Sequence, residues 1–301
     1  MDKYIEIIKE YFDSKNIELV SETSNLVFKV ITTNNEVVYA KFYLNKSSHI
    51  DNELYLYDIL DKIYLKEVIK SSNDPKYAFF KELKGKTLDE LSKEELKKYK
   101  DQIIDSIIYF YETISKVKVN NYGLLNSDLN GTSNSFEEFI YNRQSNTEKI
   151  LSEYPILNCA FTAIYNKYKE LLVGDNSLVP IDTNAKNIMI TQDDKIKFID
   201  PGELISGPKL MGYGDFVAHT YKTELYDALI NKLKLNNEDF KRLRIYAVFS
   251  SLNILAFLKN LGVEDLEHVI PYGNTYAFYD NIKEHLEELN ITEKELKKKI
   301  I

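Results

Sequence analysis

Three short apolar segments with polar side chains between them interrupt a long helix-rich part of the chain. The segments cover 178–181, 188–190 and 196–199, and Asp182, Asn187 and Asp200 lie between or directly after them. Short apolar runs bounded by polar residues predict short strands, so we expect two carboxylates and one amide at strand ends. Phosphoryl transfer requires a carboxylate that orients the attacking hydroxyl and oxygen ligands that hold Mg²⁺ against phosphates. The spacing therefore predicts a small-molecule kinase.

The first 85 residues or so have the pattern of a small, mostly antiparallel sheet with one helix inside it. A helical spacing of apolar residues over 3–13 precedes the first strand-like runs, and the turn residues Thr33-Asn34-Asn35 predict a hairpin between two of them. Residues 49–60 return to helical spacing. Strand-like runs cover 26–31, 37–43 and 77–83.

From about residue 86 onward, helical periodicity dominates. Ser92 with Glu95 is a capping box at the start of the first of these helices. We expect helices over about 92–116, 135–152, 158–173, 216–234, 238–260 and 276–300. The predicted fold class is therefore α+β, with a nucleotide-binding lobe over 1–85 and a helical lobe over 86–301 that carries the catalytic loop.

Composition excludes several classes of protein. A 301-residue chain with 44% hydrophobic and 29% charged residues is typical of a globular protein, and a net charge of −8 argues against a nucleic-acid partner. No apolar run reaches the ~20 residues that span a bilayer, and the charged N-terminal segment does not resemble a secretory signal. The single Cys159, followed by apolar residues, indicates core packing. We expect a cytoplasmic location and no membrane partner.

The motif residues resemble the aminoglycoside phosphotransferase and choline kinase superfamily. Its catalytic loop usually reads His-Gly-Asp-x-x-x-x-Asn, and here Pro180-Ile181-Asp182-Thr-Asn-Ala-Lys-Asn187 stands in that place. The metal-binding motif appears as Ile199-Asp200-Pro-Gly, and Gly214-Asp215-Phe-Val-Ala fits a further acidic motif. The resemblance covers most of the chain and implies a bilobal protein-kinase-like fold.

The resemblance also assigns roles. It implies that Asp182 orients the acceptor hydroxyl, that Asn187 and Asp200 bind Mg²⁺, and that ATP or GTP is the phosphate donor. Asp215 is expected to brace the catalytic loop without contacting substrate. The resemblance also implies six nucleotide-binding residues in the smaller lobe. They are the strand lysine Lys41, its helix partner Glu53, Ser24 and Asn25 of the phosphate-covering loop, and Glu82 and Leu83 of the hinge.

The chain departs from the family pattern at two places. Pro180 and Ile181 replace the usual His-Gly, which removes a scaffolding hydrogen-bond donor, although proline restores some stiffness by fixing φ. The phosphate-covering loop, residues 21–26, contains no glycine. Neither departure removes a predicted metal ligand or the predicted catalytic carboxylate.

The sequence leaves the acceptor open. Acidic side chains suit a polycation and aromatic rings suit a quaternary amine; the candidates were Glu203, Glu137, Glu138 and Tyr213, with Glu224, Asp227, Tyr221, Tyr272 and Tyr276 also available. The sequence is compatible with three hypotheses. The first is a kinase with an aminoglycoside-like acceptor, the second a metabolic kinase for choline, an amino alcohol or a sugar, and the third a catalytically idle nucleotide-binding relative.

Overall fold

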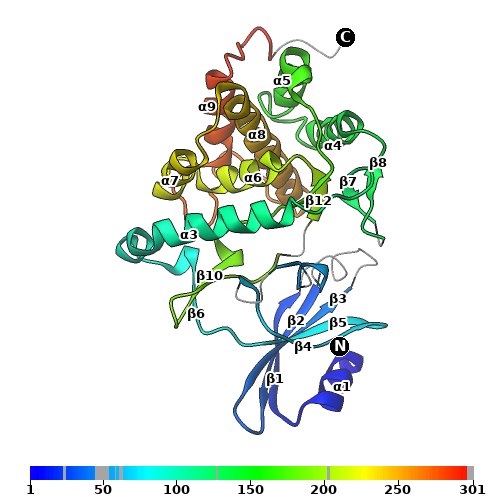
Figure 1. The fold of residues 1–301 in the computed structure, drawn as a ribbon. Coiled ribbons are helices and arrows are strands. Elements are labelled where there is room, and N and C mark those ends of the chain that lie inside the picture. Colours follow the sequence, from blue (N-terminus) through cyan, green and yellow to red (C-terminus); the bar gives the residue numbers. More distant parts are fainter. Residues whose placement is uncertain are drawn as a thin grey trace.

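The structure, a computed structural model, has two lobes (Figure 1). It describes residues 1–22, 25–44, 54–57, 59–60, 64–126, 128–201 and 204–296. A five-stranded antiparallel sheet forms the smaller lobe, and helices form most of the larger one. This arrangement confirms the predicted α+β fold class.

The small lobe is a sheet with the strand order β1-β2-β3-β5-β4, covered on one face by a helix. Residues alternate along β2, with every second side chain buried. On the covered face, Phe28 and Phe42 pack with Ile8 of the helix, whose apolar residues recur at helical spacing. The elements are α1 (Asp2–Tyr11), β1 (Ser14–Glu22), β2 (Asn25–Thr32), β3 (Val37–Tyr43), β4 (Val68–Asn73) and β5 (Lys76–Lys81).

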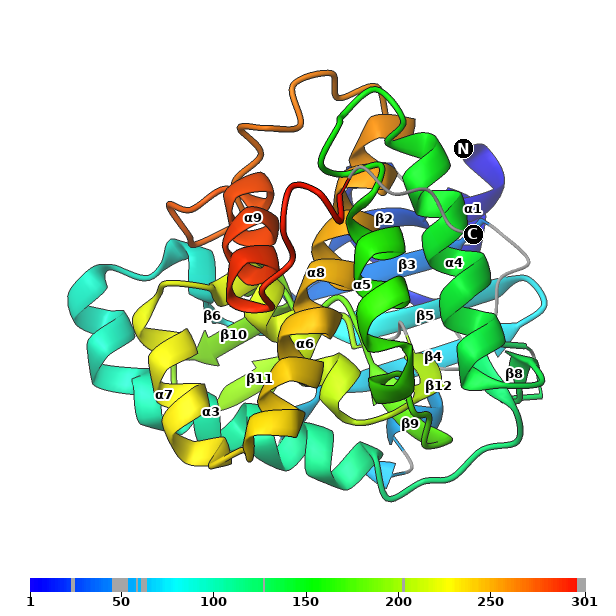
Figure 2. The same cartoon turned by 90° about the horizontal axis from the view of Figure 1, so that it is seen from above.

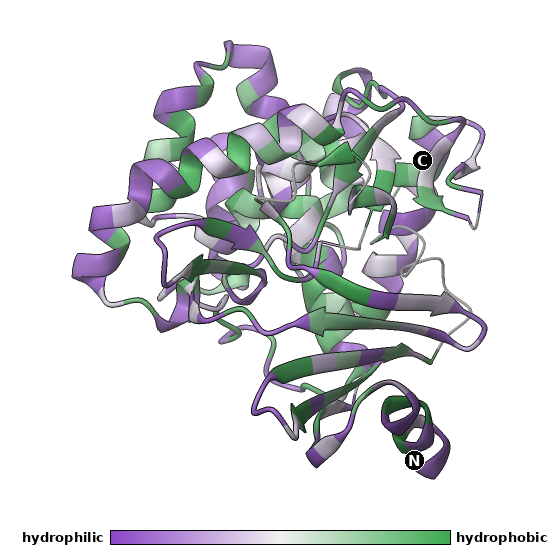
Figure 3. Ribbon diagram, turned by 60° about the horizontal axis from the view of Figure 1, so that its bottom comes forward, coloured by the Kyte–Doolittle hydropathy of each residue, from purple (hydrophilic) through white to green (hydrophobic). Residues whose placement is uncertain are grey.

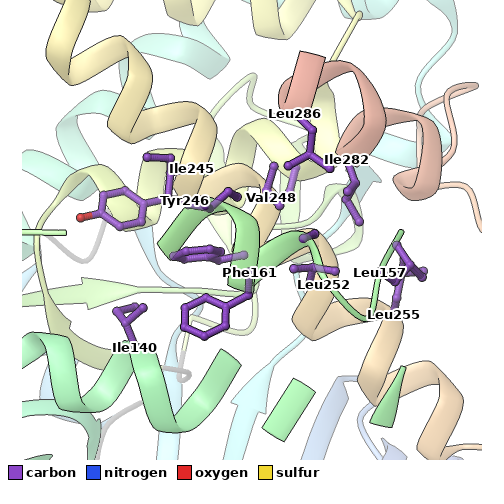
Figure 4. Close-up of a cluster of buried hydrophobic side chains, with 14 of the residues drawn as sticks. Ile140, Leu157, Phe161, Ile245, Tyr246, Val248, Leu252, Leu255, Ile282 and Leu286 are labelled. Atoms are coloured by element: carbon purple, nitrogen blue, oxygen red, sulfur yellow. The ribbon is translucent and has the colours of Figure 1, made fainter. Parts of the chain in front are cut away.

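The larger lobe is organised around one long helix, α8 (Asn237–Asn260). Seen from above, α8 lies between α9 (Phe278–Glu288) on one side and α5 (Ala160–Tyr168) and α4 (Phe136–Ile150) on the other (Figure 2). Figure 4 shows the apolar side chains that these helices bury against one another, among them those of Phe161, Leu252 and Ile282. Hydrophilic and hydrophobic residues alternate along the helices (Figure 3), as expected for helices that bury one side.

Two helix predictions were wrong in extent. The helix expected over 216–234 is two helices, α6 (Leu210–Thr220) and α7 (Glu224–Leu233), because Lys222 between them has φ +61°, which a right-handed helix cannot contain. The last helix, α9, is shorter than the predicted 276–300. The capping box is confirmed: Ser92 and Glu95 exchange hydrogen bonds at the start of α3 (Lys93–Ile114). None of the described helices combines the length and apolar composition that a bilayer crossing requires.

Two small sheets hold the segment that carries the polar motif. One has the order β11-β10-β6, with β6 (Gly85–Thr87), β10 (Ile188–Thr191) and β11 (Ile196–Phe198). The other has the order β8-β7-β12-β9, with β7 (Tyr122–Leu125), β8 (Gly131–Ser133), β9 (Ser177–Pro180) and β12 (Leu204–Gly207). The three apolar runs predicted as strands are β9, β10 and β11. The loop between β9 and β10 therefore joins the two sheets.

Gly214 allows α6 and α8 to pack closely. A Cβ atom at this position would lie 2.5 Å from the Tyr246 Cβ and 2.9 Å from the Tyr246 carbonyl carbon, which cannot move without its helix. We expect Gly214→Ala to lower the free energy of unfolding by about 1–3 kcal/mol, because overpacking outweighs the ~1 kcal/mol that alanine adds in helix propensity. Chemical denaturation measures the difference.

Gly207→Ala is the matched control for Gly214→Ala. Its Cβ would lie 3.1 Å from the Met211 sulfur, at the flexible end of a side chain. We expect a change below about 1 kcal/mol for this variant. Equal effects of the two substitutions would contradict the helix-contact explanation.

Candidate active site

The loop between β9 and β10 presents the Asp182 carboxylate in a conformation that is rare for a residue with a side chain. Asp182 has φ +67°, in the left-handed region. The Asn187 side-chain amide closes the loop by donating to the Asp182 carbonyl at 2.8 Å and to its Oδ2 at 3.1 Å, and Asn184 donates to Oδ1 at 2.7 Å. Strained backbone of this kind persists where surrounding bonds enforce it, and it is frequent at functional sites.

A buried network fixes the other side of the same loop. The Thr183 backbone N–H donates to Asp215 Oδ2 at 2.9 Å, and the Ser250 hydroxyl donates to Asp215 Oδ1 at 2.5 Å. The Tyr111 hydroxyl donates to Thr183 Oγ1 at 2.6 Å. Burial raises the pKa of Tyr111 well above its usual value, so the hydroxyl keeps its proton and remains a donor. The sequence identified Asp215 but not Tyr111, Thr183 or Ser250, because no local pattern links them.

Asp200 lies beside Asn187 and is paired with a cation from the other lobe. The Ile199 N–H donates to the Asn187 carbonyl at 2.9 Å, so Asp200 follows at the same edge. Lys41 Nζ lies 2.6 Å from Asp200 Oδ1, and the Lys41 side chain, which also lies over the Tyr43 ring, is buried. The structure thus brings Lys41 of the smaller lobe together with Asp182, Asn187 and Asp200 of the larger one.

The donor set of this site fits Mg²⁺. Both hydrogen bonds that Asn187 makes with Asp182 use Nδ2, which leaves Oδ1 of the same amide to act as a ligand. The Asp200 carboxylate is half exposed and offers the second oxygen ligand. Mg²⁺ at phosphoryl-transfer sites commonly takes one or two protein oxygen ligands and completes its octahedron with phosphate oxygens and water. In the described ranges, no three His, Cys, Asp or Glu residues form a protein-only cage.

The predicted hinge is tethered to both lobes. The Glu82 N–H donates to the Val37 carbonyl of β3 at 3.2 Å, and the Lys84 carbonyl accepts from the Gln192 N–H of the β10–β11 turn at 2.9 Å. Leu83 lies between these two bonds. Because its N–H is used by the sheet, the Glu82 backbone retains only its carbonyl for the predicted contact with the nucleotide.

The remaining nucleotide-binding residues differ in how far the structure describes them. Asn25 begins β2 and pairs with Tyr43, two residues along β3 from Lys41, so it lies at the same end of the sheet as the lysine. Ser24, Glu53 and Glu203 lie outside the described residues. Their predicted roles stay predictions.

Three residues predicted to contact substrate are placed elsewhere. Tyr213 is 1% exposed, packs against Tyr111 and donates to Glu112 Oε1 at 3.3 Å, so a substrate role for it was wrong: an interior side chain cannot line an open cleft. Glu138 accepts from the Asn134 N–H at 3.0 Å, and Glu137 accepts from the Tyr165 hydroxyl at 2.5 Å.

The position of α4 explains why the two glutamates do not reach the catalytic loop. In the four-stranded sheet Pro180 pairs with Leu204, whereas Ser177 pairs with Gly207 at the opposite end. Ser133, which precedes α4, pairs with Tyr122 at that opposite end. The catalytic loop follows Pro180, so Glu137 and Glu138 start their helix at the far end of the sheet.

Cys159 is not part of the site. Burial, with a further contribution from Glu148, raises the pKa of the Cys159 thiol to about 11. The thiolate needed for nucleophilic chemistry is therefore scarce near neutral pH.

Solved structures of phosphotransferases share this fold over nearly the whole chain. The aminoglycoside phosphotransferase APH(4)-Ia aligns with a TM-score of 0.68 at 13% identity, over 96% of this chain and 97% of that one. A thermostable mutant of that protein was solved with AMP-PNP and hygromycin B. Choline kinase LicA from Streptococcus pneumoniae aligns with a TM-score of 0.66 at 15% identity, over 96% and 99% of the two chains. The streptomycin–ATP complex of APH(2")-IIa aligns with a TM-score of 0.58 at 14% identity, over 98% and 97%.

Sequence comparisons give no further assignment. No protein-family model matches the sequence, and no curated protein matches it. The structural similarity therefore shows the fold: the chain has the bilobal, protein-kinase-like fold that the motif residues predicted.

Proposed function

We propose that this protein is a nucleotide-dependent kinase that phosphorylates a hydroxyl group of a small molecule. The observation that carries the proposal is the network of Lys41, Asp182, Asn187 and Asp200, in which a lysine of one lobe meets an acid–amide–acid set of the other. The fold shared with aminoglycoside and choline kinases supports the same reading.

Each residue of the network has a definite task in this proposal. Asp182 accepts a hydrogen bond from the acceptor hydroxyl, orients it in line with the transferred phosphorus and takes its proton late. Lys41 neutralises phosphate charge, and Asn187 and Asp200 supply oxygen ligands for Mg²⁺, whose chemistry is to withdraw charge from the phosphates. Asn184 and Asn187 keep the Asp182 carboxylate pointed outward. We propose ATP or GTP as the donor, and Glu53 as a further partner of Lys41.

The missing His-Gly pair does not argue for an idle relative. Pro180 lies in β9, paired with Leu204, and Thr183 is held by Asp215 and Tyr111. These bonds supply the rigidity that the usual histidine would give. Hydrogen bonds from Asn184 and Asn187 also hold the Asp182 carboxylate in place, as an orienting group requires.

The acceptor is a separate matter. The aminoglycoside kinases among the similar structures support the aminoglycoside-like acceptor expected from the sequence, and the choline kinase supports an amino alcohol. The residues of this chain give less support to the aminoglycoside-like acceptor. Tyr213 is buried, and Glu137 and Glu138 are distant from the catalytic loop.

The test is Mg²⁺-dependent release of ADP or GDP in the presence of aminoglycosides, choline, amino alcohols, sugars and hydroxy acids. We expect at least one acceptor to stimulate release well above the rate of hydrolysis by water. Stimulation that disappears when Mg²⁺ is chelated supports the kinase. Nucleotide binding without stimulation by any acceptor class contradicts it and favours the idle relative.

A further inference from the structure

Lys186, an exposed cation, lies next to Asn187, the proposed Mg²⁺ ligand, and its ammonium group contacts the exposed ring of Tyr272. Lys186 directly precedes Asn187 in the turn η4 (Ala185–Asn187), and its Nζ lies 3.7 Å from the centroid of the Tyr272 ring. Both side chains are exposed, Tyr272 by 53%. A separation this short is typical of a cation–π contact. The ring therefore holds the ammonium at the rim of the loop that carries Asp182.

The turn that carries Tyr272 is built to hold the ring in place. Asn274 N–H donates to the Pro271 carbonyl at 3.1 Å, and Gly273 between them has φ +72°, as in a type II turn. The Asn274 side-chain amide donates to the carbonyls of His219 and Tyr221 at 3.0 and 3.1 Å, which fastens the turn to the end of α6.

The same turn is in contact with the catalytic loop. A Cβ at Gly273 would lie 3.3 Å from the Ala185 side chain, so the two backbones approach closely there. The Asn274 hydrogen bonds and the contact with Ala185 thus fix the turn, so the exposed Tyr272 ring stays beside Lys186.

The charge of Lys186 is available to a ligand. Within the described part of the chain, no carboxylate lies within 4.0 Å of its ammonium group, and the ring is its one recorded partner. Asp89, whose backbone lies close to Gly273 of the same turn, accepts from the Thr87 hydroxyl at 2.6 Å. A quaternary amine, which the sequence suggested for Tyr272, would have to displace Lys186 from the ring and approach a like charge. The Lys186 ammonium on the Tyr272 ring therefore favours an anionic ligand.

Lys186 belongs to the loop that carries Asp182. The Asn187 amide reaches the Asp182 carbonyl at 2.8 Å, so the two ends of the loop meet. Lys186 and Asn187 are adjacent, with Cα atoms about 3.8 Å apart. The backbone of Lys186 is therefore part of the same closed loop as Asp182, which is the basis for assigning both residues to one acceptor.

We propose that the acceptor carries an anionic group, a carboxylate or a phosphate, which Lys186 binds while the Tyr272 ring positions the ammonium. The inference rests on the proposed kinase function and narrows its acceptor to hydroxy acids or phosphorylated alcohols. Lys186 is then a specificity-determining residue and Tyr272 a positioning residue.

The test uses pairs of acceptors that differ in one acidic group: glycerate with glycerol, serine with ethanolamine, gluconate with sorbitol, and glycerol 3-phosphate with glycerol. We expect the acidic member of at least one pair to have the higher kcat/KM. Lys186→Met should lower that value about ten- to hundredfold, mainly through KM, since a charge-assisted hydrogen bond is lost. Lys186→Arg should retain most of it, and the neutral member should change little.

Matched variants separate the ring from the charge. Tyr272→Leu should lower kcat/KM for the acidic acceptor about two- to tenfold, and Tyr272→Phe, which keeps the aromatic face, should restore it. Lys149→Met removes an exposed lysine in the last turn of α4 and should have no effect. Retained preference for the acidic member in Lys186→Met overturns the proposal. So does weaker nucleotide binding in that variant without a change in acceptor preference.

A binding measurement distinguishes the failure of this inference from the failure of the kinase proposal. Isothermal titration of the same pairs, with Mg²⁺ and AMP-PNP present, reports acceptor affinity without turnover. Tighter binding of acidic members that depends on Lys186 supports the anion site even if no phosphate is transferred. Equal or weaker binding of the acidic member in every pair overturns it, and preferential binding of choline or kanamycin does the same.

Discussion

Replacing Asp182 with asparagine should lower phosphate transfer about 10³-fold or more while nucleotide binding stays close to that of the wild type. A side-chain amide cannot accept the proton of the attacking hydroxyl, and general base contributions are typically 10²–10⁴-fold. Asparagine also tolerates the left-handed conformation at φ +67°, so the loop should keep its backbone path. Lys41 and Asp200, which we propose to lie beside the nucleotide, are unchanged. Turnover and Mg-nucleotide affinity are the two measurements.

Asp193→Asn is the matched control for Asp182→Asn. Asp193 lies on the β10–β11 turn, where it is exposed and accepts from the Thr191 hydroxyl at 2.6 Å. Its loss should leave turnover within about twofold, as for other surface sites away from the chemistry. Near-normal turnover of Asp182→Asn would remove Asp182 from the mechanism. Loss of nucleotide binding as well would instead indicate collapse of the loop.

Several of the larger elements were predictable from the sequence because their signals are local. Strands β2, β3 and β5 and helix α3 have clear apolar periodicity, and the α3 capping box lies within four residues. Strands β1, β4, β6, β7, β8 and β12 were not predicted. β1 and β4 are the outer strands of the five-stranded sheet, and neither shows an alternation of buried and exposed residues. The other four have three or four residues each and form because they pair with other strands, a relation that no local window contains.

The residues of the site were likewise predictable only where their signal is local. Asp182, Asn187 and Asp200 are close in sequence, so their spacing already implied a shared edge. Lys41 required knowledge of the fold, since its contact with Asp200 joins segments 159 residues apart. The errors concern which face a residue occupies. Tyr213 lies on a helix that is buried on nearly every side, so that periodicity could not separate its interior position from an open one.

Asp215 supports the loop between β9 and β10 and takes no part in the proposed chemistry itself. Both of its oxygens accept buried hydrogen bonds, one from the Thr183 N–H and one from the Ser250 hydroxyl. We expect Asp215→Leu, which has a similar shape and accepts neither bond, to lower the free energy of unfolding by about 2–4 kcal/mol. It should also lower kcat about 10–100-fold, because small misplacement of a catalytic group is costly. Thermal or chemical unfolding and steady-state kinetics give the two values.

Asp215→Asn separates hydrogen bonding from charge at the same position. Its amide oxygen can accept from the Thr183 N–H while its NH₂ group donates to the Ser250 hydroxyl, which is able to accept. We therefore expect it to retain most of the stability and to keep kcat within about tenfold of the wild type. If asparagine were as damaging as leucine, the buried charge would be what stabilises the loop. If leucine left kcat unchanged in protein that remained folded, Asp215 would have no part in positioning Asp182.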